Sequence, residues 1–391
     1  MRLAARIALL ALVVGGCART GGAVPSAAPP GAPGAAAPGA SGAPGGAVAA
    51  AASAGPGSAA APGPAAEAGR AAGGMGASSA PVAVVAPPTS VRASYSIVSG
   101  SLGPYWMADA AGLWKQHGLD VELTFIAGAP TSMAALMAGE TAFAVAAGDS
   151  VLNAQAQNPD VVAVLNTSVG STHRLMVAPD IQRPEDLRGR RVGVNSLGDG
   201  SYMLLSKAFR HLGLDPAHDV IWTAVGGGGA ASYVAGLAAG SLDAAPLTPP
   251  NDLLAERQGI HALLALADLD LPTAGLPAFT MRRTIEQQRA VVEAFAAGVI
   301  DGVRRFKADP ALAKQVLAQK TGSSDQEVLD WTYTVYGGAN STDRPFIDRA
   351  RVQAVLEDLT ASQPELGQVQ LDKSIDNSVL DDLERKGYFG Q

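Results

Sequence analysis

The fold of this 391-residue chain is best read from residues 108–123, Ala108-Asp-Ala-Ala-Gly-Leu-Trp-Lys-Gln-His-Gly-Leu-Asp-Val-Glu-Leu123. Their first part has helical spacing and runs to about His117, where Gly118 supplies the left-handed residue that commonly ends a helix. From Asp120 to Phe125 apolar and polar residues alternate, as in a half-buried strand. A helix that passes through one glycine into a strand is the repeating element of α/β proteins.

The same alternation of strands and helices continues along the chain. The sequence predicts strands at residues 91–98, 120–125, 142–146, 190–194, 220–225 and 243–247. It predicts helices at residues 104–117, 131–138, 202–211 and 230–239, with another after Gly148, and then long helices at 284–306, 310–320, 324–336, 346–360 and 376–386. This spacing indicates mostly parallel sheets that are flanked by helices.

Two short segments recur at matching places in this pattern. Ser101-Leu-Gly103 recurs as Ser196-Leu-Gly198, and Leu136-Met-Ala-Gly139 recurs as Leu237-Ala-Ala-Gly240. About 300 residues also exceed what a single core usually supports. We therefore expect two lobes of similar construction, the first made of residues 89–175 and 271–391 and the second of residues 176–270.

Residues 1–17 have the features of an export signal. Arg2 and Arg6 give a positive start, and residues 7–14 are an apolar run shorter than the ~20 residues that span a membrane. Val14-Gly-Gly-Cys17 resembles the lipobox of bacterial lipoproteins, and Cys17 is the only cysteine in the chain. We expect Cys17 to be lipidated and to anchor the protein outside the cytoplasm, in the periplasm or at the cell surface. The alternative is an ordinary cleaved signal with a chance cysteine.

Residues 18–88 consist almost entirely of Ala, Gly, Pro and Ser. Such side chains cannot bury enough area to offset the entropy of the chain, so we expect a disordered tether. Four of the 28 basic residues and one of the 35 acidic residues precede residue 89, which leaves a formal charge near −10 on the remainder. That charge argues against nucleic acid as a partner.

Loops at the carboxyl ends of strands are where open α/β sheets bind ligands. The sequence places such loops at residues 99–106, 148–150, 172–174, 195–202 and 247–252. Several carry Ser, Thr or Asp before a helix, where free N–H groups favour an anionic or dipolar ligand group, although simple helix capping uses the same residues. Tyr105 and Trp106 could stack on a flat ligand or pack in the core, and both interpretations stay open.

Sequence motifs for catalysis are missing. The chain has no phosphate loop, no dinucleotide fingerprint, no H-E-x-x-H and no G-x-S-x-G, and its five histidines lack metal-ligand spacing. Asp149 and Asp199 could formally serve as an acid–base pair, but nothing else around them suggests a reaction. We therefore expect no cofactor, no metal and no enzyme.

Residues 108–123 and 133–143 together resemble the start of the NMT1/THI5-like solute-binding proteins of ABC importers. That group includes binders of nitrate, taurine, alkanesulfonates and thiamine precursors. Pro184-Glu-Asp-Leu-Arg-Gly-Arg-Arg-Val-Gly-Val194 resembles the entry into the second lobe of that family, and Asp376-Asn-Ser-Val-Leu380 resembles its closing helix.

The resemblance implies a type II periplasmic-binding-protein fold, with two lobes, a two-segment hinge and a small organic solute held in the cleft between the lobes. ABC permease subunits would be the protein partner of a monomer that a lipid anchor holds at the membrane. By position, the expected ligand-binding residues are Ser99, Gly100, Ser101, Tyr105, Trp106, Gly148, Asp149, Ser150, His173, Ser196, Asp199, Gly200, Ser201, Tyr202 and Thr248.

The solute class is only loosely constrained. These loops hold no lysine, and their only basic residues are His173 and Arg174. This favours a neutral or heterocyclic solute, containing sulfur or nitrogen, over nitrate or a simple sulfonate. Two other functions stay open. One is an enzyme on the same scaffold, like the pyrimidine-forming members of the family, whose cysteine-rich segment is absent here. The other is a ligand-sensing module of a membrane receptor.

Overall fold

The computed structural model describes residues 84–197, 200–226, 229–338 and 340–390. The expected export signal, with Cys17, and most of the expected tether therefore lie outside the described residues. Contacts with the first sheet and its helices begin before residue 89, because the Val85 N–H donates to the His117 carbonyl (3.1 Å) and its side chain packs on the core. None of the helices within the described ranges is long and apolar enough to cross a membrane.

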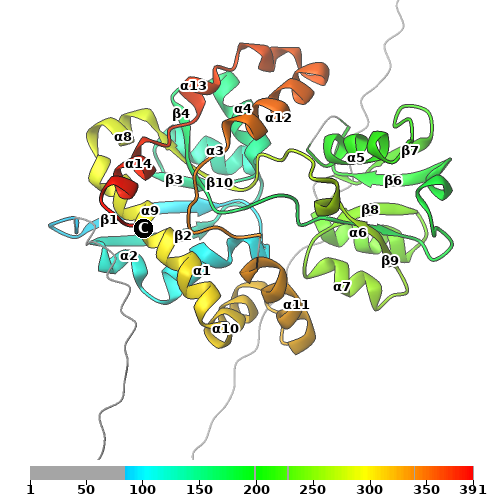
Figure 1. The fold of residues 1–391 in the computed structure, drawn as a ribbon, viewed down its shortest axis with the longest axis horizontal. Helices are drawn as coiled ribbons and strands as arrows, with labels where there is room; N and C mark the ends of the chain where they lie inside the picture. The colour runs from blue at the N-terminus through cyan, green and yellow to red at the C-terminus, as the bar shows by residue number, and fades with distance from the viewer. Residues whose placement is uncertain (1–83, 198–199, 227–228, 339, 391) are drawn as a thin grey trace, which may run out of the picture. The chain divides into compact units, whose positions relative to one another are not determined.

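The first sheet has five strands, in the order β2 (Leu119–Phe125), β1 (Thr89–Tyr95), β3 (Phe143–Val145), β10 (Pro277–Met281) and β4 (Val161–Asn166) (Figure 1). β1 is parallel to both β2 and β3, whereas β10 is antiparallel to β3 and β4. The sheet is thus mostly parallel, with one antiparallel strand that comes from much later in the sequence.

The second sheet repeats this arrangement. Its order is β7 (Val220–Ala224), β6 (Arg190–Val194), β8 (Ala244–Leu247), β5 (Arg174–Val177) and β9 (His261–Ala265). β6 is parallel to β7 and β8, and β5 is antiparallel to β8 and β9. In each sheet the antiparallel strand is the one by which the chain enters from the other sheet. The expected similarity in construction is confirmed, and so is the mostly parallel α/β fold.

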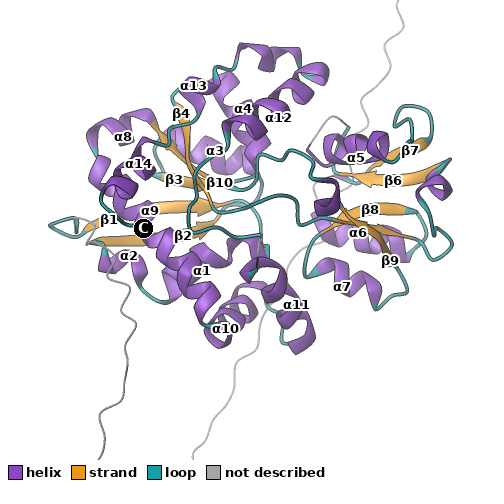
Figure 2. Cartoon of the chain, viewed as in Figure 1, coloured by secondary structure: helices purple, strands orange, loops and turns teal. Residues whose placement is uncertain are grey.

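Helices flank both sheets (Figure 2). They are α1 (Gly103–Ala110), α2 (Leu113–Gln116), α3 (Ala129–Ala138), α4 (Gly148–Gln157), α5 (Gly200–His211), α6 (Gly229–Ala238), α7 (Asn251–Glu256), α8 (Arg282–Gln287), α9 (Arg289–Ala308), α10 (Pro310–Thr321), α11 (Gln326–Gly337), α12 (Arg349–Ser362), α13 (Leu371–Ser374) and α14 (Ser378–Arg385). The single helix expected at 104–117 is two helices, because Gly112 adopts a left-handed conformation (φ 63°) between them.

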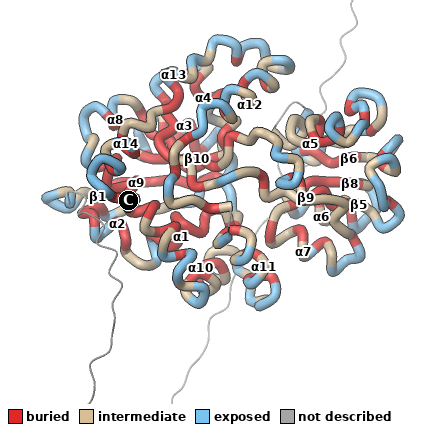
Figure 3. The backbone as a smooth tube through the Cα atoms, in the orientation of Figure 1, coloured by how far each residue is buried: buried red, intermediate tan, exposed pale blue. Residues whose placement is uncertain are grey.

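The core of the first sheet is built around α9, which is buried along most of its length (Figure 3). Phe295 of this helix stacks on Phe143 of β3, with 3.8 Å between ring centroids, and on Trp114 of α2. Complete burial of such a side chain stabilises the fold by about 1.5–3 kcal/mol. α10 and α14 also pack on α9, so these late helices complete the layer that begins with α1. The lobe boundaries at residues 175 and 270 stay a prediction.

Candidate ligand-binding site

The hydroxyl of Tyr336, on α11, gathers three loops that are far apart in the sequence. It lies 3.3 Å from Ser99 Oγ, which follows β1, and 3.4 Å from Thr172 Oγ1, on the segment that connects β4 to β5. The side chain of Thr248, directly after β8, also lies beside this hydroxyl. Burial raises the pKa of Tyr336, so the hydroxyl stays neutral and protonated. The structure thus brings the predicted residues Ser99 and Thr248 together around a tyrosine that sequence reasoning missed.

Gly100 is required beneath this tyrosine. A Cβ at residue 100 would lie 2.4 Å from Tyr336 Cδ2 and 2.5 Å from Thr332 Cγ2, far inside van der Waals contact. On its other side, Ser99 Oγ accepts hydrogen bonds from the N–H (3.4 Å) and the hydroxyl (3.2 Å) of Ser101. The loop after β1 therefore combines a capping role with a set of hydroxyl groups beside Tyr336.

The first turns of α4 and α5 meet at Asp149. A Cβ at Gly200 would lie 2.4 Å from Asp149 Oδ2, so this carboxylate lies against the first residue of α5. Such a position is favourable because the helix N-terminus carries partial positive charge. In α4 itself, the Gly148 N–H donates to the Gly275 carbonyl (3.0 Å), and Ser150 lies within the first turn, partly exposed. Predicted residues from both sheets thus come into contact here.

The remaining predicted residues of the second sheet lie in the first turn of α5 and in the loop before it. Ser201 Oγ accepts a backbone hydrogen bond from this loop (3.1 Å), and Ser196 is exposed. Tyr202 packs on Trp222, with 4.7 Å between ring centroids, and is partly buried against the core of its own sheet. Asp199 lies outside the described residues.

His173 and Arg174, the two basic residues where the β4–β5 connection enters β5, both have partners within the protein. The Arg174 guanidinium donates to Asp252 (3.2 Å) and to Glu256 (2.5 Å). His173 Nδ1 lies 3.2 Å from Ser171 Oγ, and burial lowers the pKa of His173 to about 4. At neutral pH the imidazole is therefore uncharged, and the guanidinium is already paired.

Side chains beside Arg174 also join α7 to α11. The Trp331 indole N–H donates to the buried carboxylate of Asp252 (3.0 Å), and Arg257 pairs with Asp325 and with Glu327 (2.6 Å). These residues were also missed from the sequence. One signal could have indicated α11, because this helix holds three aromatic residues in a chain with only 5% aromatics.

Tyr105 and Trp106 are both fully buried in the core of the first sheet. Trp106 packs edge-on against Tyr95, with 5.9 Å between centroids. The Tyr105 hydroxyl faces that of Thr167 without reaching hydrogen-bond geometry, and burial raises its pKa. Of the two interpretations left open by the sequence, this placement favours core packing over stacking on a ligand.

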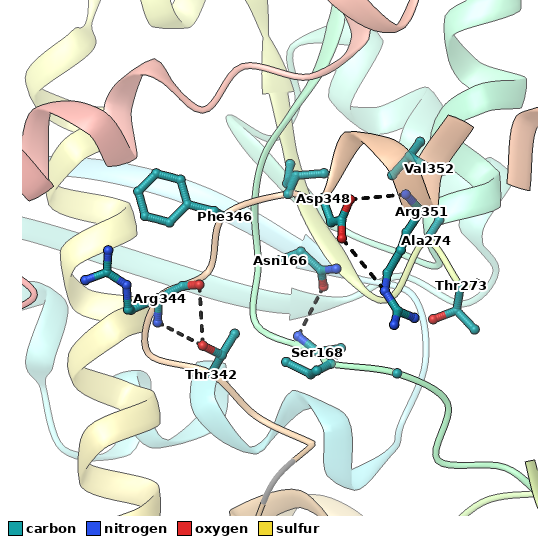
Figure 4. A pocket seen from close by; sticks show the side chains of 13 residues that line it. Asn166, Ser168, Thr273, Ala274, Thr342, Arg344, Phe346, Asp348, Arg351 and Val352 are labelled. Carbon is teal, nitrogen blue, oxygen red and sulfur yellow. Dashed lines mark hydrogen bonds and ion pairs between the residues drawn. The ribbon is translucent and has the colours of Figure 1, made fainter. Parts of the chain in front are cut away.

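A pocket of about 180 Å³ lies elsewhere, between the two segments that connect the sheets and the chain around residues 342–352 (Figure 4). None of the predicted ligand-binding residues within the described ranges lines it.

Comparison with known families matches residues 100–313, more than half of the chain, to the model described as NMT1/THI5 like. The chain belongs to the NMT1/THI5-like family. Among curated relatives, proteins of Brucella abortus, B. suis and B. melitensis that are named as candidate binding proteins are 30% identical over 121 residues. This match covers 29% of the chain, which thus spans little more than a third (37%) of these relatives' length.

Solved structures of other proteins show the same fold as this NMT1/THI5-like chain. The periplasmic aliphatic sulphonate-binding protein SsuA of Escherichia coli is 20% identical, with a TM-score of 0.62 over 74% of this chain and 92% of that one. The alkanesulfonate-binding SsuA of Xanthomonas axonopodis pv. citri, bound to MOPS, gives 20% identity and a TM-score of 0.61 over 75% and 99%. The predicted periplasmic-binding-protein fold is confirmed.

Proposed function

We propose that this NMT1/THI5-like protein is the solute-binding component of an ABC importer and captures a small organic solute between its two sheets. The Tyr336 hydroxyl carries this proposal, because it lies beside Ser99 of the first sheet, Thr248 of the second and Thr172 of the connecting segment. A solute that contacts groups from both sheets favours the arrangement in which they are close. That differential affinity is what a ligand-driven closure requires.

The charges of the site support a neutral solute. His173 is uncharged at neutral pH, and Arg174 is paired with two carboxylates. The Asp149 carboxylate already lies at the first turn of α5, where an anion would otherwise be favoured. Hydroxyl groups are thus the main groups of the site that could form hydrogen bonds to a solute. The proposal is a polar, neutral solute such as a nitrogen- or sulfur-containing heterocycle.

We propose that the protein binds its solute and does not convert it to a product. The pair most similar to a catalytic dyad is Ser171 and His173, with 3.2 Å between Oγ and Nδ1. No carboxylate among the described residues orients this imidazole, and a pKa near 4 makes it a weak base at neutral pH. Ser171 Oγ also accepts the His173 backbone N–H (3.2 Å), as in a local turn. The pair is therefore explained by its role in shaping the connecting segment.

The proposed location is outside the cytoplasm, at a membrane to which lipidated Cys17 holds the protein. Residues 18–88 would then form the tether, and a flexible chain of this length has a root-mean-square reach of roughly 45–50 Å. That reach lets a monomer approach its permease while it stays on the membrane. The two steps of the proposal, capture and delivery, thus use different parts of the chain.

Native mass spectrometry of freshly purified full-length protein tests the proposal. We expect a fraction of the wild-type protein to carry a small molecule, and we expect Tyr336→Phe to lower that fraction. Tyr333→Phe is the matched control, because its hydroxyl bonds to the Lys307 carbonyl (3.0 Å), away from the site. Equal loading of the two variants, conversion of the bound molecule to a product, or copurification with a sensor kinase in place of a permease would contradict it.

A further inference from the structure

Helix α11 belongs to the core of the first sheet, whereas α7 belongs to the core of the second. Leu329 and Tyr336 of α11 are buried in the cluster around β1 and α9, and Ala255 of α7 is buried in the cluster around β5 and β8. Each contact between these two helices therefore holds one sheet against the other. The contacts join protein side chains only, so their formation does not require a solute.

The charged part of this contact is centred on Arg257, the residue that follows α7. Its guanidinium pairs with Asp325, directly before α11, and with Glu327 in the first turn of α11 (2.6 Å). Hydrogen bonds from Arg257 lower the pKa of Asp325 to about 2, so this pair stays charged near neutral pH. All three side chains are more than a third exposed, so dissolved salt screens their attraction. Ionic strength is therefore the condition that weakens this cluster.

The uncharged part of the contact is made by Trp331. Its indole N–H donates to Asp252 Oδ2 (3.0 Å), and the Arg174 guanidinium lies over its ring, 5.5 Å from the centroid. The Asp252 side chain has no exposed surface, so salt screens this hydrogen bond much less. We name five residues the α7–α11 clasp: Asp252, Arg257, Asp325, Glu327 and Trp331.

A further contact between the two cores lies at α5 and α12. Met203 of α5 packs on the cluster that holds Leu356 and Leu359 of α12. Beside it, Lys207 pairs with Asp358, and these side chains are only 17% and 32% exposed. Apolar burial and a shielded ion pair respond weakly to salt. The α7–α11 clasp is thus the contact between the cores that ionic strength changes most.

The clasp and the candidate site share one helix. Tyr336, whose hydroxyl lies beside Thr248 of the second sheet, is on α11 with Trp331. Because a helix moves as a rigid unit, separation of α11 from α7 carries this hydroxyl away from Thr248. We propose that Arg257 is a positioning residue for solute capture, whose ion pairs to α11 hold the two sheets together and thereby raise the solute affinity at low ionic strength.

The effect on affinity rests on the proposed solute function, but the separation of the sheets can be measured without a solute. Double electron–electron resonance on the full chain with Cys17→Ser makes this measurement. One spin label is placed at Ala235, exposed on α6, and the other at Gln315, exposed on α10. α6 packs on α7 and α10 packs on α11, so the labels lie on the two sides of the clasp.

Loss of the clasp should move these labels apart. We expect Arg257→Gln, or about 1 M NaCl in the wild type, to lower the ratio of short to long distances by about two- to tenfold. Arg190→Gln is the matched control. Arg190 is 34% exposed, close to the 38% of Arg257, and it pairs with Asp180 (2.5 Å) within the second sheet's own lobe. Its loss should leave the distances unchanged.

Calorimetric titration with the solute that native mass spectrometry identifies tests the role in capture. We expect the wild-type affinity to fall by about two- to tenfold between about 0.05 and 1 M NaCl, and the affinity of Arg257→Gln to change less. The difference between the two proteins isolates the clasp, because any direct effect of salt on the solute is common to both. Arg257→Lys keeps the charge and should retain part of the salt dependence.

Two results would overturn the proposal. One is an unchanged distance distribution in Arg257→Gln and in high salt. The other is the same salt dependence of affinity in Arg257→Gln as in the wild type. Absence of any bound solute would contradict the proposed function and, with it, the role of Arg257 in capture, whereas the distances in the solute-free protein would still show whether the clasp holds the sheets together.

Discussion

The indole Nε1 of Trp331 donates a hydrogen bond to Oδ2 of Asp252 at 3.0 Å and thereby joins α11 to α7. The same carboxylate accepts a hydrogen bond from Arg174 of β5 (3.2 Å), and its side chain has no exposed surface. Asp252 is thus the acceptor for two donors that come from different elements. Loss of a buried group of this kind costs more than the loss of either donor alone, because it takes one acceptor from Arg174 and leaves the indole N–H of Trp331 without its acceptor.

Asp252→Ala is therefore expected to be strongly destabilising. We predict a fall of about 3–5 kcal/mol in the free energy of unfolding, since an arginine and an indole N–H lose their buried acceptor. The control is Glu256→Ala, which removes the second, more exposed carboxylate beside Arg174 and should cost about 0–1 kcal/mol. Urea unfolding followed by circular dichroism measures both. Equal losses would show that Asp252 is not the centre of this network.

Gly100→Ala should disturb the site without removing any polar group. Its Cβ would overlap the ring of Tyr336, so we predict a loss of about 1–3 kcal/mol in unfolding free energy. Gly367→Ala provides the comparison, because the nearest atom to its added Cβ is Thr360 Cγ2 at 3.6 Å, an ordinary contact. Thermal unfolding of the two variants decides the matter, and a Gly100→Ala protein as stable as Gly367→Ala would refute the close packing.

His173 should make the fold less stable in mild acid. Its pKa is about 4 in the folded protein and about 6.5 when unfolded, so between these values the unfolded chain binds more protons. The free energy of unfolding therefore falls as the pH decreases from about 6.5 to about 4, by at most about 3 kcal/mol from this residue. Above that window the residue contributes nothing to the pH dependence.

The variant His173→Gln should remove much of this pH dependence in denaturant unfolding measured from pH 7 to pH 4.5. His218→Gln is the control, because that exposed imidazole pairs with Asp215, which raises its pKa. Its removal should leave the acid destabilisation in place. A His173→Gln protein with the same pH profile as the wild type would rule out burial as the cause.

Much of the fold could be predicted because its signals are local. The strand at residues 190–194 was predicted with the observed limits, and the glycine at 118 ends a helix as expected, with φ 77°. Strand β4 was missed, since residues 161–165 are a continuous apolar run without alternation, which fits a buried helix equally well. β10 was missed because its partners lie more than 100 residues earlier.

The site could be predicted only in part. Ser99 and Thr248 follow from the position of ligands at strand ends, which depends on topology alone. Tyr336 does not, because it lies within a helix near the end of the chain, and only tertiary packing brings its hydroxyl to those loops. Tyr105 and Trp106 show the converse, since they occupy a predicted loop and helix start but face the core.

The predicted lipid anchor at Cys17 can be tested by mutation. Cys17→Ser should move the protein from the membrane fraction to the soluble fraction of cells that process lipoproteins, because no thiol is left to acylate. Immunoblotting of the two fractions and the intact mass of the purified protein provide the measurement. Retention of Cys17→Ser in the membrane fraction with unchanged mass would mean that another segment holds it there.

Small-angle X-ray scattering with and without the solute tests the account most directly. The solute that native mass spectrometry identifies is removed by partial unfolding and dialysis and then added back. The account predicts a smaller radius of gyration in the loaded protein, and a weaker change in Tyr336→Phe. Identical scattering of the loaded and empty wild-type protein would contradict capture by closure of the two sheets.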